Sequence, residues 1–346
     1  MKIALLTYST RPRGGVVHTL ALAEALAALG QDVTVWTLAR GGGFFRPVDQ
    51  RVRLRQVSFD EVPGEDVGAR ILRSIEVLRA AFDGSAYDIV HAQDCISANA
   101  AGRCVRTIHH LDTFTTPELA ACHERAIVEP FAHLCVSAAV AAEVRAGWGI
   151  SPTVIPNGVD AARFANAVPD RRHGRYLLAV GGIEPRKGSL DLLRAFARIG
   201  DPSLRLVIAG GETLFDYRAY RVAFDELAAA LGVTPEILGP VAHDELPGLV
   251  AGAAAFAFPS TKEGFGLAAM EALAAGVPVV VRDLPVLREV FGASVLYGSE
   301  PASFADSLRT AMEKPDPARA AAGRARAEAH TWTGTAHRHL DFYRSL

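Results

Sequence analysis

Two glutamates bracket a glycine-containing turn in the segment 263–271, which reads EGFGLAAME. The segment follows an apolar run that ends at Pro259 and leads into a helical pattern. We expect the residues between the glutamates to present backbone N–H groups at a helix start, which favours a phosphate or sugar oxygen. These residues are Gly264, Phe265, Gly266 and Leu267. Taken alone, the pattern also fits a glycine turn entering an amphipathic helix with two surface acids.

The spacing of Glu263 and Glu271 fits a ligand with two polar ends. Eight residues of helix extend up to about 12 Å along the axis. That length is close to the span from a sugar ring, across a diphosphate, to a ribose. A carboxylate accepts hydrogen bonds from two adjacent hydroxyls. One glutamate can therefore hold a ribose while the other holds a sugar.

A basic turn, VGGIEPRKG at 180–188, follows a predicted strand and precedes a predicted helix. Arg186 can bind a diphosphate with two N–H groups, and Lys187 can act as a point charge. A departing nucleoside diphosphate needs its developing charge stabilised by such cations. An exposed basic turn without a ligand is the alternative interpretation.

Two further motifs follow predicted strands in the first half of the chain. Gly14 and Gly15 allow a backbone to approach a ligand closely, although a plain tight turn explains them equally well. His109 and His110 are adjacent in TIHHLD, so their side chains point to opposite sides in extended chain. No third ligand has a spacing that suits zinc. For His91, at the end of another predicted strand, a structural role is favoured.

Two motifs are absent from the sequence. There is no D-x-D, the carboxylate pair of many metal-dependent nucleotide-sugar sites, so we expect no metal and no cofactor other than a sugar nucleotide as co-substrate. There is no G-x-x-x-x-G-K-[ST], which excludes a Walker-type kinase or ATPase.

Short strand patterns alternate with helical patterns along the chain, which predicts parallel sheets covered by helices. The predicted strands are 2–7, 32–38, 88–91, 103–109, 133–137, 176–181, 203–209, 236–239, 253–259 and 277–281. The predicted helices are 18–29, 70–82, 189–199, 217–231 and a short one from Leu267. The rhythm breaks at 155–175, which is rich in turn formers and predicts a linker. We therefore expect an N-terminal domain over 1–160 and a C-terminal domain over 170–330, with a ligand cleft between them.

Composition narrows the class of protein. The 346 residues carry 36 basic and 38 acidic side chains, and this balance argues against a dedicated nucleic-acid binder. The four cysteines are irregularly spaced, which predicts reduced thiols. No apolar stretch reaches membrane-span length, and the apolar start is too short for a signal peptide. We expect a cytoplasmic protein. Weak contact with the inner membrane face through helix arginines such as Arg70, Arg73 and Arg79 remains an alternative to a solvated helix face.

Taken together, these residues resemble a family 4 retaining glycosyltransferase with the GT-B fold. The resemblance spans nearly the whole chain. It rests on the RGG loop, the T-x-H turn at His109, VIPNGVD at 154–160, the P-x-K-G turn, LGPV at 238–241, the two-glutamate motif and an aromatic terminal helix from Trp332. It implies an α/β architecture of two Rossmann-like domains whose parallel sheets face each other across a cleft, with the helix 331–346 returning to the N-terminal domain.

The resemblance also implies roles for individual residues. Glu271 would hold the ribose, while Glu263 and the backbone of Phe265–Leu267 would contact the donor sugar and diphosphate. Arg186 and Lys187 would neutralise the diphosphate, and the backbone near Leu238 and Val241 would meet the base. The N-terminal domain would contribute Gly14, Gly15 and His109 around the transferred sugar and the acceptor. Family members usually carry an arginine where this chain has Gly182, and Arg186 could supply that charge instead.

The implied activity is metal-independent transfer of a sugar from a nucleoside-diphosphate sugar to a hydroxyl acceptor with retention of anomeric configuration. The acceptor could be a small molecule, a glycan or a lipid-linked sugar. A nucleotide-sugar 2-epimerase on the same fold is the alternative enzyme, and it would epimerise the donor without an acceptor. A nicotinamide dehydrogenase would need the G-x-G-x-x-G that this chain lacks. A non-catalytic sugar-nucleotide sensor would bind a donor without turnover.

Overall fold

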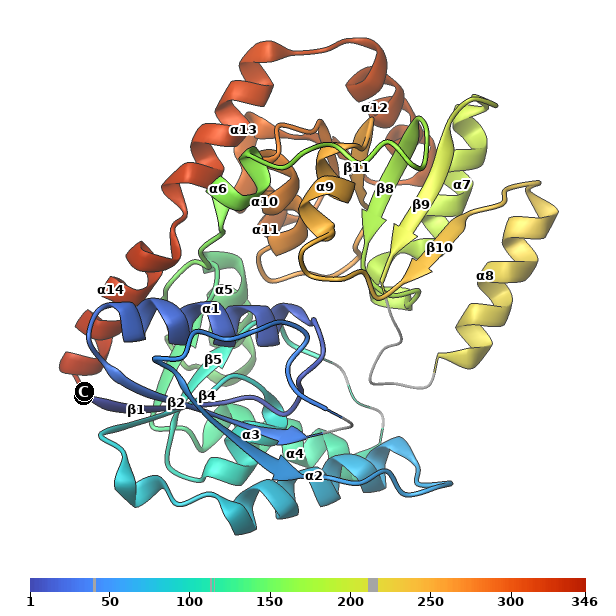
Figure 1. Ribbon diagram of the computed structural model, residues 1–346. Coiled ribbons are helices and arrows are strands. Elements are labelled where there is room, and N and C mark those ends of the chain that lie inside the picture. Colours follow the sequence, from blue (N-terminus) through green and yellow to red (C-terminus); the bar gives the residue numbers. More distant parts are fainter. Residues whose placement is uncertain (40–41, 113, 115, 211–216) are drawn as a thin grey trace. The chain divides into compact units, whose positions relative to one another are not determined.

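The computed structural model describes residues 1–39, 42–112, 114, 116–210 and 217–346. The chain divides into two compact units (Figure 1). Unit 1 comprises Met1–Gly158 and Trp332–Leu346, and unit 2 comprises Val159–Thr331.

Within its described residues, unit 1 is built on a seven-stranded parallel sheet with the order β3-β2-β1-β4-β5-β6-β7. The strands are β1 (Lys2–Leu6), β2 (Asp32–Ala39), β3 (Arg53–Ser58), β4 (Ile89–Ala92), β5 (Val105–Ile108), β6 (Ala132–Cys135) and β7 (Thr153–Val154). The helices are α1 (Gly14–Ala28), α2 (Val67–Ala81), η1 (Gly84–Ala86), α3 (Cys95–Ala101), α4 (Pro117–Val128), α5 (Ala138–Trp148) and α14 (Trp332–Arg344).

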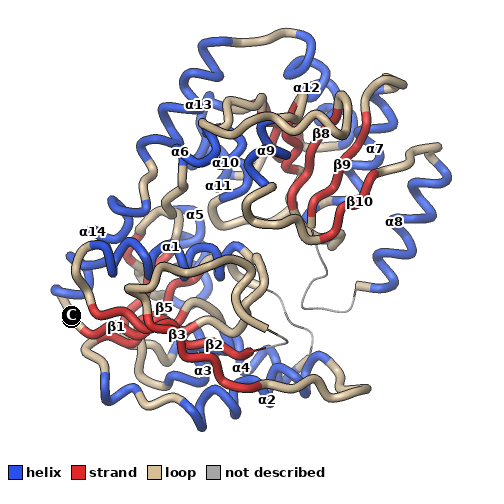
Figure 2. The backbone as a smooth tube through the Cα atoms, viewed as in Figure 1, coloured by secondary structure: helices blue, strands red, loops and turns tan. Residues whose placement is uncertain are grey.

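The described part of unit 2 holds a six-stranded parallel sheet in the order β10-β9-β8-β11-β12-β13, drawn in red in Figure 2. The strands are β8 (Tyr176–Val180), β9 (Arg205–Ala209), β10 (Glu236–Gly239), β11 (Ala255–Phe258), β12 (Val279–Arg282) and β13 (Leu296–Gly298). The helices are α6 (Ala161–Ala165), η2 (Pro185–Lys187), α7 (Ser189–Ile199), α8 (Arg218–Ala230), α9 (Leu246–Ala251), α10 (Leu267–Ala274), α11 (Pro285–Phe291), η3 (Gly292–Ser294), α12 (Pro301–Glu313) and α13 (Pro317–Ala329).

In both sheets the strand order reverses beside the first strand of the unit, β1 or β8. This is the topology of Rossmann-like domains, in which ligands bind at the carboxyl ends of the strands next to the reversal. The loops after β1, β4 and β5 in unit 1, and after β8 and β11 in unit 2, are therefore the ones that position a site. They contain the segments that the sequence singled out.

The terminal helix α14 is an integral part of unit 1. It lies beside α1 on one face of the sheet (Figure 1). Its Ala336, Leu340 and Tyr343 pack into the same apolar core as Leu20 and Leu26 of α1. Burial of this apolar surface holds α14 in place against the sheet.

Buried histidines add a polar layer beneath α14. His91 bonds the Tyr343 hydroxyl through Nδ1 at 2.6 Å and the Thr107 hydroxyl through Nε2 at 2.7 Å. Burial lowers the pKa of His339 to about 4 and holds the pKa of His91 well below its usual value. The expected structural role of His91 is confirmed, since both ring nitrogens are occupied by internal partners.

Unit 2 has its own apolar core between the sheet and helices α7, α8 and α12. Leu192 and Leu193 of α7 and Phe224 of α8 are buried there against the β8 and β9 side chains. Helices α10 and α13 contact each other, and α10 also contacts α6 (Figure 1). The sheet is thus covered by helices, as the strand–helix alternation predicted.

Two local expectations are wrong. The first helix begins at Gly14 rather than His18, so Gly14 and Gly15 form its first turn instead of a loop. A helix can begin there because the N–H groups of a first turn form no intrahelical hydrogen bonds. The free-energy cost of glycine, which applies to the helix interior, is therefore smaller at this position. The predicted linker 155–175 contains the helix α6, in which Asp160 caps the N-terminus and Phe164 is buried. The sequence pattern did not predict this short helix because turn-forming residues flank it on both sides.

The arginines considered for membrane contact are largely engaged within the protein. Arg73 pairs with an acid at 2.6 Å, and Arg79 donates to the carbonyl of Asn99 at 2.7 Å. Arg53 of the edge strand β3 and Arg51, which precedes that strand, also pair with acids. The acids are Glu65, Asp49 and Asp32. Among the helices that the structure describes, none is both long enough and apolar enough to cross a membrane.

Gly158, the last residue before the chain enters unit 2, packs directly on the start of α14. A Cβ atom there would lie 2.5 Å from the backbone nitrogen of Trp332 and 2.6 Å from its Cα. Because backbone atoms cannot swing aside, we predict that Gly158→Ala lowers the free energy of unfolding by about 1–3 kcal/mol. Urea unfolding of the purified variant measures this loss.

Gly147→Ala is the matched control for this prediction. Gly147 lies in α5, is exposed, and has no neighbouring atom within 4 Å of an added Cβ. Alanine there should raise stability by up to about 1 kcal/mol, because it lowers the conformational entropy of the unfolded chain. A Gly158→Ala variant as stable as the wild type would contradict the packing described above.

Candidate functional site

The turn after β8 lies against the end of β11. Gly188 has a left-handed φ of +65°, and a Cβ atom there would lie 2.2 Å from the carbonyl oxygen of Pro259. The backbone N–H of Thr261 donates to the carbonyl of Arg186 at 2.8 Å. Only glycine permits both the left-handed turn and this close approach. The P-R-K-G turn and the loop that carries Glu263 are thereby fixed to each other.

The two cations of this turn meet at one carboxylate. The Lys187 Nζ lies 2.6 Å from the Glu263 Oε1, and an Arg186 nitrogen lies 3.2 Å from the same oxygen. A second nitrogen of Arg186 contacts Glu184 at 3.0 Å. The side chains of Lys187, Arg186 and Glu263 are 20%, 29% and 11% exposed, so the cluster is accessible yet shielded enough to strengthen its electrostatics.

The lysine is aimed by its surroundings. The Lys187 side chain passes over Gly181, where an added Cβ would lie 3.2 Å from the lysine Cε. Its Nζ also lies 5.2 Å from the centre of the Phe258 ring, at cation–π distance. Three of the residues predicted to act on the donor, Arg186, Lys187 and Glu263, are therefore in direct contact with one another.

The loop between the two glutamates enters α10. Gly264, Phe265 and Gly266 are buried, and Leu267 is the first residue of the helix. The ring of Phe265 packs edge-on against His330 at 5.7 Å. Gly266 is the N-cap, and no side chain caps this end of the helix within the described part of the chain. The helix start thus presents the partial positive charge that the sequence predicted.

Glu271 lies in the second turn of α10 and is mostly buried. Burial raises the pKa of its carboxyl from 4.5 to about 7. The positive charge of Arg163 opposes this rise, and Asp160 adds to it. A carboxyl group that is poised near neutral pH and shielded from water is a recurrent feature of binding sites.

Arg163 is a residue that the sequence analysis missed. It lies in α6, and its guanidinium donates to the backbone carbonyl of His243. His243 follows Leu238 and Val241, which lie at and just beyond the end of β10 and are partly buried. Arg163 therefore connects the predicted base-binding segment with Glu271. Its position in an apparent linker gave no sign of this role.

In unit 1, His109 follows the end of β5 and packs over the start of α1. A Cβ on Gly15 would lie 3.8 Å from the imidazole Cδ2 of His109, and the His18 ring packs edge-on against the His109 ring at 4.8 Å. Desolvation, reinforced by His18 and Arg106, holds the pKa of His109 well below 6.5. His109 is thus a neutral imidazole at pH 7. Its neighbour His110 contacts a different partner, Asp112, at 3.2 Å.

Gln93 was also missed. It follows β4 and is 2% exposed, and its Oε1 lies 3.1 Å from the His109 Nε2. His18 is held in turn by Asn157, whose Oδ1 lies 2.8 Å from the His18 Nδ1. These contacts fix the His109 ring. The motif DIVHAQD placed Gln93 at a strand end, which was the available signal.

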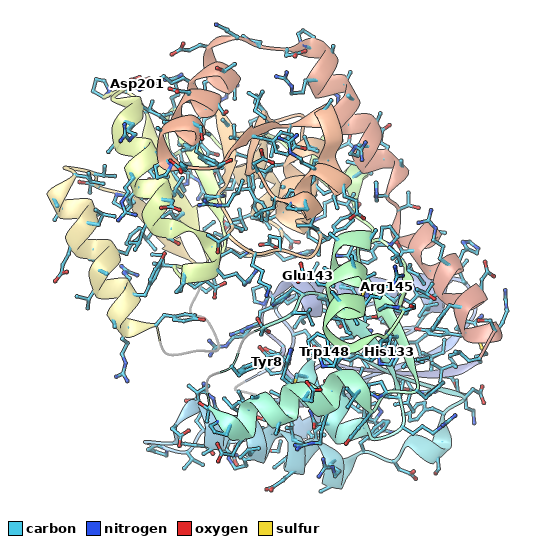
Figure 3. All side chains as sticks on the ribbon, turned by 180° about the vertical axis from the view of Figure 1, so that it is seen from behind. Tyr8, His133, Glu143, Arg145, Trp148 and Asp201 are labelled. Carbon is cyan, nitrogen blue, oxygen red and sulfur yellow. The ribbon has the colours of Figure 1, made fainter. Side chains whose placement is uncertain are left out.

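Further residues surround the start of α1. The Arg13 guanidinium lies 5.8 Å from the ring centre of Tyr8, which follows β1 and is labelled in Figure 3. Gly14 has open space around the position of a Cβ. Arg13 is the N-cap of α1, but its side chain makes no capping hydrogen bond. This end of unit 1 therefore carries positive charge above the glycines.

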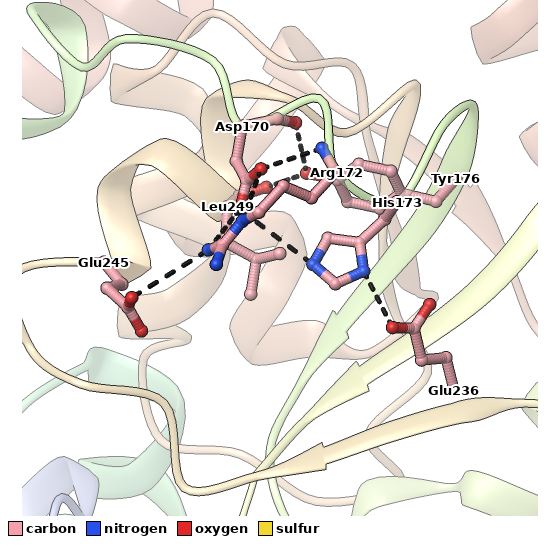
Figure 4. A network of polar contacts seen from close by, with 7 residues as sticks. All are labelled: Asp170, Arg172, His173, Tyr176, Glu236, Glu245 and Leu249. Carbon is pink, nitrogen blue, oxygen red and sulfur yellow. Dashed lines mark hydrogen bonds and ion pairs between the residues drawn. The ribbon is translucent and has the colours of Figure 1, made fainter.

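Within the described residues, no three His, Cys, Asp or Glu side chains converge as metal ligands. A separate hollow of about 420 Å³ in unit 2 is lined by Arg163, Asp170, Arg172 and Glu245, among others. Two of its lining residues pair with each other, since Arg172 binds Asp170 at 2.7 Å, and nearby His173 binds Glu236 at 2.9 Å (Figure 4). We interpret this network as structural.

Comparison with known proteins identifies the class. Residues 162–328 match the family described as glycosyl transferases group 1, and residues 12–163 match Glycosyltransferase Family 4. The chain belongs to the group 1, family 4 glycosyltransferases and is a transferase enzyme. The family and the α/β fold class expected from the sequence are thereby confirmed.

Individual relatives are distant. The chain is 29% identical to a D-inositol 3-phosphate glycosyltransferase of Salinispora tropica, over 99% of this chain and 85% of the relative. It is 29% identical to a glycogen synthase of Mycobacterium tuberculosis, over 86% of this chain and 71% of the relative. Among solved structures, Anabaena HepE in complex with UDP and glucose superposes with a TM-score of 0.80 at 20% identity, over the full length of both chains.

The raised pKa of Glu271 predicts that removing its carboxyl group stabilises the fold in a pH-dependent way. Because the folded protein holds a proton on Glu271 up to about pH 7 while the unfolded chain releases it near 4.5, ionising this carboxyl destabilises the fold as pH rises between those values. We predict that Glu271→Gln raises the free energy of unfolding by about 1–3 kcal/mol at pH 8, and by little at pH 4.5. Urea unfolding at the two pH values measures the difference.

The exposed Glu313, near the end of α12, provides the matched control. Glu313→Gln removes the same charge and should leave stability within about 0.5 kcal/mol at both pH values. A Glu271→Gln variant that is less stable than the wild type at pH 8 would show that the carboxylate is favourably bound rather than desolvated.

The contact between Gln93 and His109 predicts a defined imidazole tautomer. The Oε1 of Gln93 accepts from Nε2–H and leaves the His109 Nδ1 as an acceptor. In wild type, ¹⁵N–¹H correlation spectra of the imidazole should report the Nε2–H form. Gln93→Leu should yield a mixture of both tautomers. Gln93→Glu should instead raise the pKa of His109, because a carboxylate favours the imidazolium. Unchanged His109 signals in both variants would refute the assignment.

Proposed function

We propose that the protein is a retaining, metal-independent glycosyltransferase that moves a sugar from a nucleoside-diphosphate sugar to a hydroxyl acceptor. The observation that carries the proposal is the cluster of Lys187, Arg186 and Glu263 beside the helix that bears Glu271. Cations that can bind a diphosphate and a carboxylate for sugar hydroxyls occur on the loops after β8 and β11, and a shielded carboxyl for a ribose lies on the helix α10 that follows.

Each residue has a role in this proposal. Lys187 and Arg186 stabilise the leaving diphosphate, and Arg186 supplies the charge that family members carry where this chain has Gly182. Glu271 accepts hydrogen bonds from the ribose hydroxyls, which requires its ionised form. Glu263 binds the transferred sugar. The N–H groups of Phe265, Gly266 and Leu267 contact the diphosphate, and the backbone around Leu238 and Val241 meets the base.

Unit 1 contributes His109, together with Gly14 and Gly15, to the sugar and acceptor. An imidazole whose pKa is far below 6.5 is a weak base, so His109 suits hydrogen bonding better than proton abstraction. The departing phosphate oxygen can take the proton of the acceptor hydroxyl instead. The new glycosidic bond then forms on the face that the diphosphate leaves, which retains the anomeric configuration. The protein contributes positioning and charge stabilisation.

The relatives suggest where to begin the search for substrates. UDP-sugars are the first donors to test, because HepE binds UDP and glucose. Phosphorylated polyols and α-glucan chains are the first acceptors to test, because the distant relatives are named for such reactions. A thermal-shift panel of UDP-, GDP- and ADP-sugars identifies the donor without an acceptor, since binding to the native state raises Tm.

Lys187 and Glu271 should affect different steps of the reaction. With the identified donor, we predict that Lys187→Ala lowers kcat by about 10²–10³-fold, because it removes a charge that acts on the leaving group. Glu271→Ala should mainly raise the donor Kd, measured by calorimetry, by about tenfold or more. Release of nucleoside diphosphate in the presence of acceptor measures turnover.

Lys314→Ala, at the exposed end of α12, is the matched control and should behave as wild type. Near-wild-type kinetics for both Lys187→Ala and Glu271→Ala would refute the proposed site. An epimerised nucleotide sugar formed from the donor alone would instead reveal a nucleotide-sugar 2-epimerase.

A further inference from the structure

Glu263 is paired with both of the cations that are proposed to bind a diphosphate. Its Oε1 atom lies 2.6 Å from the Lys187 Nζ and 3.2 Å from a nitrogen of Arg186. Both cations are thus directed at a single anionic oxygen. A diphosphate attracted to Lys187 and Arg186 therefore meets a carboxylate that the same two cations already hold, and it competes with that carboxylate for them.

The fold holds the carboxylate in this place. Two backbone contacts join the segments that carry the cations and the carboxylate. The N–H of Thr261 donates to the carbonyl of Arg186, and Gly188 approaches Pro259 closely. Glu263 is 11% exposed, and Lys187 is confined between Gly181 and the Phe258 ring. The ion pairs are therefore preorganised rather than chance contacts of mobile surface chains.

We propose that Glu263 is a specificity-determining residue that competes with the diphosphate for Lys187 and Arg186, and so favours the intact donor over the spent nucleoside diphosphate. This inference rests on the proposed function and adds a second role for Glu263. When an intact donor binds, its sugar hydroxyls give the displaced carboxylate new hydrogen-bond donors. A spent nucleoside diphosphate offers no such hydroxyls, so the displaced carboxylate faces an anion without compensation.

Charge accentuates the difference. The terminal phosphate of a free nucleoside diphosphate is linked only through the anhydride bond, and it gains a second negative charge near pH 6. In the intact donor this phosphate is also esterified to the sugar and lacks the second charge. Repulsion from Glu263 is therefore stronger for the product than for the substrate. After transfer, Glu263 can return to Lys187 and Arg186 as the product leaves, which opposes product inhibition.

The test compares Glu263→Gln with wild type by calorimetry against three ligands: inorganic pyrophosphate, the nucleoside diphosphate identified in the thermal-shift panel, and the intact nucleotide sugar. We expect pyrophosphate and the nucleoside diphosphate to bind the variant about tenfold more tightly, because the competing carboxylate is gone. The intact donor should bind equally well or more weakly. The selectivity of wild type for donor over product should therefore fall by at least tenfold.

Glu184→Gln is the matched control. Glu184 contacts Arg186 at 3.0 Å but makes no ion pair with Lys187 within the described residues, and its removal changes the net charge equally. It should tighten pyrophosphate binding by less than threefold. If Glu184→Gln and Glu263→Gln tighten binding equally, general electrostatics explain the effect and the proposal is wrong. Glu263→Asp, which withdraws the carboxylate by one methylene, serves as a second variant if Glu263→Gln folds poorly, and it should also tighten product binding.

The possible failures are distinguishable. If Glu263→Gln weakens binding of the nucleoside diphosphate and the nucleotide sugar alike, Glu263 is a plain binding residue, and the inference fails while the proposed function stands. If the wild type and both variants bind neither pyrophosphate nor any nucleotide, the proposed function and the inference fail together.

Discussion

A single oxygen atom organises the candidate site. The Oε1 of Glu263 is the point where the two cations of the turn after β8 meet the loop after β11. Neither segment could hold this arrangement alone, because long cationic side chains lose considerable entropy when they are fixed. The close approach of Gly188 to Pro259 brings the two loops together and makes the convergence possible. The chemistry of the side chains thus depends on a backbone contact that involves no charge.

Two glutamates of this region have different electrostatic environments. Glu263 faces two cations, whereas Glu271, on the adjoining helix, is mostly buried and has a pKa raised to about 7. Glu263 is paired with two basic side chains, whereas Glu271 ionises at a cost to stability. A site that retains such a destabilised group trades fold stability for ligand binding.

The sequence predicted the parts of the fold that local patterns encode. The helix α7 has the predicted bounds, and α10 begins at Leu267 as expected, because glycine and proline mark their limits. The edge strand β3 escaped detection, since its largely exposed, arginine-rich residues lack the alternation of a half-buried strand. The short helix α6 was hidden among turn formers. In both cases tertiary packing, which local propensity does not describe, decided the structure.

The same limit applies to the site. Arg186, Lys187 and Glu263 could be proposed as site residues from the sequence, because strand ends in a parallel sheet collect at one edge. Gln93 and Arg163 could not be assigned, because their significance lies in contacts with residues 16 and 80 positions away. No periodicity or motif reports such a contact. Likewise, the convergence of Lys187 and Arg186 on Glu263 is a matter of distances that the sequence alone does not contain.

The points where the chain leaves and re-enters unit 1 are each secured locally. Gly158 packs on Trp332 within unit 1, and the N–H of Val159 donates to the carbonyl of His330 at 2.8 Å within unit 2. Because Val159 and His330 are hydrogen-bonded neighbours, unit 2 has its two ends side by side, as an inserted domain does. Topologically, residues 159–331 are a segment inserted into the Rossmann-like unit 1, and α14 completes unit 1 after the insertion. Such a segment could be exchanged between related chains with a single pair of junctions.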